Sequence, residues 1–158
     1  MTTAERGGRG AAVGLFRAVT VLHAAMTVVQ ALAAGAVLQA SLAGFLVHQA
    51  VGGTLLLVAV AQVAVAVLAW RPGRLPPWPI AIAAGLVVGE VAQVALGFTG
   101  VLAVHVPLGV AIVGTAVALA VWAVRARPGP REGSVIAPAA PGTPPPHRAQ
   151  RAPGAITG

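Results

Sequence analysis

Four long apolar runs alternate with short polar or proline-containing segments along the chain. The runs cover about residues 18–38, 46–70, 80–99 and 103–124. Each has roughly the twenty residues that a helix needs to cross a hydrocarbon core of about 30 Å. Because lipid offers no partner for backbone N–H and C=O groups, each run should form an α-helix. The pattern predicts an all-α integral membrane protein, an up-down-up-down four-helix bundle within residues 18–124.

The two ends of the chain lack such runs. Residues 1–17 are polar to mixed and are predicted to form a cytoplasmic N-terminal segment, in which Gly7-Gly8-Arg9-Gly10 should be flexible. Residues 125–158 are rich in Pro, Gly and Ala and have little apolar surface to bury. Such a composition predicts a disordered cytoplasmic tail.

The composition supports a membrane location. The chain has 158 residues, of which 58% are hydrophobic and only 8% charged, whereas roughly a quarter of the residues in a soluble domain are charged. A small globule has too little interior to bury so much apolar side chain, so the lipid bilayer is the expected partner. Cysteine is absent, which excludes disulfides and thiolate chemistry. No nucleotide-binding loop, serine hydrolase elbow or zinc protease motif appears, so no catalytic residue is predicted and the sequence does not favour an enzyme.

The net charge of +7 comes from arginines that all lie outside the apolar runs. They lie before the first run, between the second and third, and after the fourth; the other two connections carry no charge. The positive-inside rule then predicts a multi-pass protein of the cell membrane with both termini in the cytoplasm. No aromatic residues are interleaved with the arginines, so nucleic acid is not an expected partner.

The two halves of the membrane part look like two copies of one helical hairpin. The second helix of each copy opens with the pattern His-x-x-x-Gly, and the first helix of each carries a glutamine. The matching positions are Gln30 and Gln93, His48 and His105, and Gly52 and Gly109. This pattern predicts an internal repeat.

The repeat makes His48 and His105 candidates for a haem site. Helices 2 and 4 of such a bundle are diagonal partners, so the two imidazoles should face each other near the outer end. Haem iron accepts imidazoles as axial ligands. Gly52 and Gly109 lie one turn further in on the same helix faces, and a missing side chain there would leave room for the flat porphyrin. Alternatively, the histidines lie at the headgroups and bind nothing, and the glycines serve helix packing.

Glu90 is the only charged side chain inside the predicted spans. An ionised carboxylate in lipid is costly, so it should face the bundle interior and be neutral or partnered. One arrangement is a contact with His23, from which a role in proton movement follows. The commoner one is a protonated carboxyl bonded to Gln93 or to a backbone carbonyl. Gln30 and Gln62 are further intramembrane amides, expected to link helices by hydrogen bonds.

Residues 15–125 resemble a family of small four-helix membrane proteins of unknown function, found mostly in actinobacteria. The resemblance rests on Val28-Val29-Gln30, His48-x-x-x-Gly52, Arg71-Pro72-Gly73-Arg74, Gln93, and His105 with Pro107. This family implies no activity. More distantly, the layout is similar to one half of haem A synthase, whose histidines on the second and fourth helices ligate haem; His48 and His105 match them. The chain has one half only and no cysteine pair, which places synthase activity in doubt.

Three functions are compatible with the sequence. The first is a membrane protein that binds haem b through His48 and His105 for electron transfer or redox sensing. The second is a cofactor-free accessory or assembly subunit that packs on other membrane subunits or on a second copy. The third is a small proton-coupled carrier centred on Glu90 and His23, which would have to dimerise to form a path.

Overall fold

The computed structural model describes residues 3–129, and this part of the chain is entirely helical apart from short connections. Its helices are α1 (Thr3–Leu38), α2 (Leu42–Trp70), α3 (Trp78–Thr99) and α4 (Leu102–Arg125). All four are long and apolar enough to span a membrane. The predicted four-helix, all-α architecture is confirmed. The tail predicted to be disordered lies, from residue 130 onward, outside the described residues.

The first helix begins earlier than the apolar pattern predicts. α1 starts at Thr3 rather than near residue 18 and includes Gly7, Gly8 and Gly10, so the prediction of a flexible segment there is wrong. Adding a residue to an existing helix costs much less than starting a helix, and the neighbouring Ala and Arg residues favour helix. The helix formed by the apolar run therefore extends into the polar segment before it.

The second helix also begins earlier, because it has a good cap. The Ser41 side chain accepts a hydrogen bond from the Gly44 backbone N–H at 3.1 Å. This bond satisfies one of the free donors of the first turn, so the helix starts at Leu42 instead of near residue 46.

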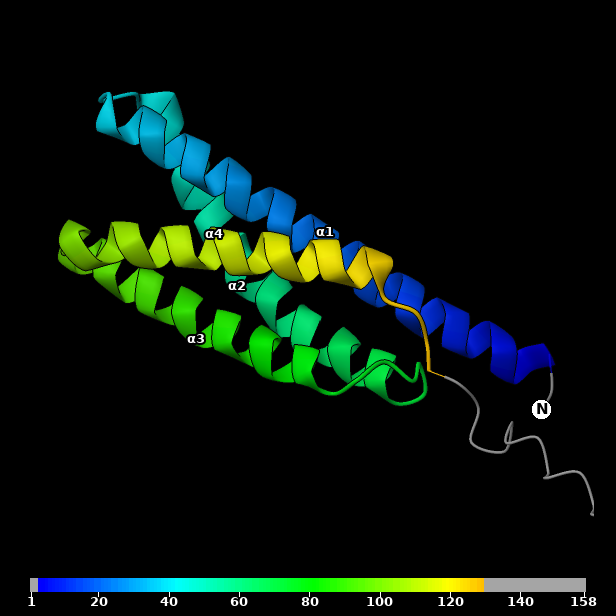
Figure 1. Cartoon of the computed structure of the whole chain (residues 1–158). Helices are drawn as coiled ribbons and strands as arrows, with labels where there is room; N and C mark the ends of the chain where they lie inside the picture. The colour runs from blue at the N-terminus through cyan, green and yellow to red at the C-terminus, as the bar shows by residue number, and fades with distance from the viewer. Residues whose placement is uncertain (1–2, 130–158) are drawn as a thin grey trace, which may run out of the picture.

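The helices form a closed four-membered ring. α1 contacts α2 and α4, and α3 contacts the same two helices, so α1 and α3, like α2 and α4, are diagonal partners. The connections 39–41 and 100–101 lie at one end of the molecule, which we call the tip end (Figure 1). The opposite end, with the start of α1, the connection 71–77 and the end of α4, is called the base end. In Figure 1 the tips of the two hairpins lie apart.

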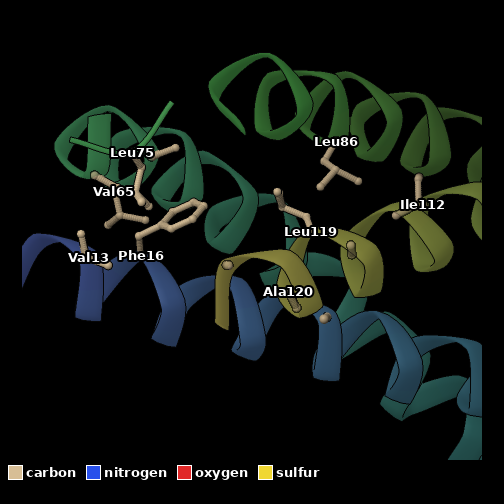
Figure 2. Close-up of a cluster of buried hydrophobic side chains, with 13 residues drawn as sticks. Val13, Phe16, Val65, Leu75, Leu86, Ile112, Leu119 and Ala120 are labelled. Atoms are coloured by element: carbon tan, nitrogen blue, oxygen red, sulfur yellow. The ribbon is translucent and has the colours of Figure 1, made fainter. Parts of the chain in front are cut away.

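The base half of the bundle has an apolar interior. Val13, Phe16, Val65 and Leu75 gather at one end of this hydrophobic cluster, and Figure 2 shows Leu86, Ile112 and Leu119 at the other. The Phe16 side chain is fully buried and makes an edge contact with Trp122, with ring centres 6.4 Å apart. This half therefore excludes water.

Arg17 joins the first helix to the last. Its Nε donates to the Ala123 carbonyl at 3.0 Å, and its Nη2 donates to the Ala126 carbonyl at 2.6 Å. The last carbonyls of a helix have no partner within the helix, and they carry its negative dipole end. The guanidinium therefore satisfies both the hydrogen bonding and the charge of the end of α4.

The outer surface of the bundle is apolar. Leu32, Leu57, Val88 and Val110 are each 69–70% exposed, and Phe98 is 83% exposed. A soluble monomer rarely exposes so much contiguous apolar surface. Together with the four long apolar helices, this surface suggests a multi-pass membrane protein.

Candidate functional site

Two histidines face each other across the bundle near the tip end. His48 on α2 and His105 on α4 come from diagonal helices, yet their ring centres are only 6.4 Å apart, with an angle of 57° between the ring planes. Both side chains are half-buried. The structure thus brings together the two residues that the repeat pattern singled out.

Each imidazole is oriented by a backbone carbonyl of a neighbouring helix. His48 Nδ1 lies 3.4 Å from the Gln30 carbonyl oxygen, and His105 Nδ1 lies 3.1 Å from that of Gln93. A carbonyl accepts only, so these contacts place the proton of each neutral ring on Nδ1. Each Nε2 then carries the lone pair. Among residues 3–129 neither Nε2 has a hydrogen-bond partner. Metal-binding histidines typically have this arrangement.

Glutamine side chains occupy the space beside Gly52 and Gly109, where the sequence predicted room for a porphyrin. A Cβ on Gly52 would lie 2.8 Å from Gln30 Nε2, and one on Gly109 would lie 2.6 Å from Gln93 Nε2. The glutamine amides therefore fill the room that we predicted for a porphyrin. Each glycine lacks a side chain, so a glutamine amide can pack directly on the helix that carries the histidine. The backbone carbonyl of the same glutamine contacts that histidine.

These glycines give a matched mutational test. In Gly52→Ala or Gly109→Ala the new methyl must displace a glutamine amide, which offsets the gain of alanine over glycine in a helix, so we expect each variant to be less stable than Gly53→Ala by about 1 kcal/mol. Gly53 is the control, since it is exposed and a Cβ there meets nothing within 4 Å. Gly53→Ala should be neutral or stabilising. Denaturant titration in detergent micelles measures all three, and an equal response at Gly53 and Gly52 would contradict the packing role.

A second polar cluster lies deeper in the bundle. His23 on α1 is fully buried, and its Nε2 lies 2.5 Å from Glu90 Oε1 on α3. Its Nδ1 lies 2.6 Å from Gln62 Oε1 on α2. The glutamate is 4% exposed. Of the two arrangements open from the sequence, the structure shows the His23 contact; Glu90 does not bond to Gln93 or to a backbone carbonyl.

The hydrogen-bond partners of His23 determine how many protons the His23–Glu90 pair carries. Gln62 Oε1 can only accept, so Nδ1 carries a proton. One further proton then lies between Nε2 and Glu90 Oε1, either as an ion pair or as a neutral imidazole beside a carboxylic acid. Both forms have no net charge, which is what burial in an apolar span requires.

Several buried polar atoms near these clusters have no hydrogen-bond partner within the described part of the chain. They are Glu90 Oε2, Gln62 Nε2, Gln30 Oε1 and Gln93 Oε1. Buried polar groups in folded proteins are nearly always paired, either with protein or with ordered water. These atoms therefore mark places where a small polar molecule would be bound.

Sequence reasoning did not anticipate two members of the deeper cluster. Gln62 was expected only to link helices, although it lies fourteen residues after His48 and thus on the same helix face. Thr27 was not considered; it is 2% exposed and lies between His23 and Gln30 on α1. The available signal was the spacing 20, 23, 27 and 30 of polar residues, which follows one face of a helix.

Protein side chains alone do not form a binding site for a bare metal ion at either cluster. In residues 3–129 no group of three or more His, Asp or Glu side chains lies close enough to hold one. Two imidazoles are available at the tip end, so any metal there must bring its other ligands with it.

The chain matches no known family model, no curated protein and no solved structure. The resemblance to small actinobacterial membrane proteins and to half of haem A synthase therefore stays a prediction. The function has to be inferred from the geometry of the two clusters.

Proposed function

We propose that this protein spans the cell membrane four times with both termini in the cytoplasm, and binds haem b between His48 and His105 for electron transfer or redox sensing. The arginines of the described part of the chain support this topology. They lie in α1 near the base end, in the 71–74 connection or at the end of α4. The base end would then face the cytoplasm and the tip end the outside.

The separation of the two imidazoles carries the haem proposal. Two rings that bind opposite sides of one metal through bonds of about 2 Å have their centres about 6 Å apart, close to the 6.4 Å between His48 and His105. The contacts of both Nδ1 atoms with carbonyls support the same role, since they leave each Nε2 for a metal. A haem supplies the four further ligands that two histidines lack.

The similar contacts of the two halves support an internal repeat. Gln30 contacts His48 and Gly52 in the first hairpin, and Gln93 contacts His105 and Gly109 in the second. Two equivalent hairpins would each contribute one axial ligand. The deeper cluster does not follow this symmetry, because it draws single residues from three helices.

The visible spectrum of the purified protein tests the haem proposal. After expression with ample haem supply, we expect a Soret band and sharp α and β bands on reduction, and loss of all three in the double variant His48→Ala/His105→Ala. Circular dichroism of the double variant provides the folding control. A colourless but folded wild-type preparation, also after added haem, would overturn the proposal and favour a cofactor-free accessory subunit.

A further inference from the structure

We infer that the interior of the tip half holds a file of water molecules that carries protons from the tip end to His23 and Glu90, and that this path ends there. This proton site is distinct from the haem proposal and does not depend on it. The site binds protons and water molecules through buried polar atoms of the interior that have no hydrogen-bond partner among the described residues.

The polar atoms extend from the deep cluster toward the tip end. Gln93 lies three residues beyond Glu90 on α3, and Gln30 lies seven beyond His23 on α1, distances of about 4.5 Å and about 10 Å along a helix. Thr27 lies between His23 and Gln30; its hydroxyl donates to the Ala24 carbonyl at 2.8 Å, which leaves its oxygen lone pairs as acceptors.

The unpaired atoms match what a water file needs. Gln62 Nε2 donates, whereas Glu90 Oε2, Gln30 Oε1 and Gln93 Oε1 accept, and all four atoms are buried without a partner. A buried water typically makes about three hydrogen bonds to otherwise unpaired polar groups. The interior thus offers a donor at the deep cluster and acceptors from there toward the tip end.

The base half stops the path. Thr20, one turn toward the base from His23, donates its hydroxyl proton to the Phe16 carbonyl at 2.7 Å, and it is the last buried polar side chain in this direction among the described residues. Phe16 itself is fully buried, and among the described residues the buried side chains that pack around it toward the base end are apolar. An apolar region of this kind does not hold water, so protons reach the deep cluster from one side only.

No other titratable side chain of the described residues faces this cluster. α1 contributes His23, α3 contributes Glu90, and α2 contributes the neutral Gln62. The nearest titratable residues of α4 are His105 and Arg125, close to its two ends. A change in proton occupancy deep in the bundle is therefore a property of the His23–Glu90 pair.

Cysteine labelling tests the path, because the natural chain has no cysteine. In sealed vesicles, a small membrane-impermeant thiol reagent should modify Thr27→Cys from the tip side. The rate should be at least about tenfold higher than for Ala116→Cys, which is 1% exposed in the apolar half and reacts only when the bundle opens. Val88→Cys lies on the outer surface of the bundle, where Val88 is 69% exposed; it should not react, because the proposed topology places it in lipid.

Thr99→Cys and Pro76→Cys identify the two sides of the membrane, so the result does not depend on the proposed topology. Labelling is done without haem and repeated with it, and the inference requires labelling without it. Modification of Thr27→Cys from the base side, or no modification from either side, would overturn the path.

Infrared spectroscopy tests the proton site itself. The infrared bands of the Glu90 carboxyl group, identified by their loss in Glu90→Gln, should shift promptly when the protein is transferred to D2O, because the water file exchanges the proton shared with His23. Bands that keep their position in D2O would overturn the inference even if the protein binds haem.

Discussion

Replacement of His23 by leucine should lower the free energy of unfolding by about 3 kcal/mol, because it leaves a buried carboxyl group without its partner. The contacts explain why. Glu90, which is 4% exposed, would lose the only side-chain partner that it has among the described residues, and Gln62 Oε1 would become a further unpaired atom. Denaturant titration of the full chain in micelles measures the loss.

The double variant His23→Leu/Glu90→Leu distinguishes a lost ion pair from lost packing. It contains no unpaired carboxyl, so it should be more stable than His23→Leu alone, with a coupling energy of about 2–3 kcal/mol in the double-mutant cycle. Thr54→Val is the surface control, since Thr54 is exposed and bonds only to its own helix. Purely additive effects of the two leucines would show that the pair contributes nothing beyond volume.

If haem binds as proposed, removal of either histidine should lower haem affinity by more than the roughly 10- to 100-fold loss that is typical when a residue behind a metal ligand is removed. We expect this of His48→Ala and of His105→Ala, and we expect millimolar imidazole to restore the spectrum of each single variant. The small-molecule ring would occupy the place of the missing side chain, between the remaining histidine and the carbonyl of Gln30 or Gln93. Titration with haem, with and without imidazole, measures both effects.

Gln49→Ala is the matched control for this experiment. Gln49 is the neighbour of His48 on α2 but is exposed, so its loss should leave haem binding unchanged. If imidazole restores nothing, or if Gln49→Ala is as harmful as His48→Ala, the two histidines do not act as axial ligands.

The sequence predicted the gross architecture well because the bilayer leaves few alternatives. Long apolar runs must be helices, and short connections make sequence neighbours into spatial neighbours; this is why His48 and His105 were expected on diagonal helices. The boundaries were less predictable. The start of α1 at Thr3 depends on the extension of a helix beyond the apolar run, and apolar periodicity does not report that extension.

The details of the site depended on side-chain volumes that a one-dimensional pattern does not give. Gly52 and Gly109 were expected to make room for a cofactor, yet the amides of Gln30 and Gln93 reach those gaps first. In the same way, Gln62 was expected to join helices, and it does, but the sequence did not show that its partner would be His23, whose protonation its Oε1 lies close enough to fix. Both outcomes depend on how closely the helices approach.

The bonds of Arg17 to the Ala123 and Ala126 carbonyls cross more than a hundred residues of sequence. During synthesis the first helix leaves the ribosome long before the last, and the carbonyls that Arg17 binds do not yet exist. These bonds can form only when translation has passed residue 126. Closure of the ring of helices is therefore a late event in the assembly of this bundle.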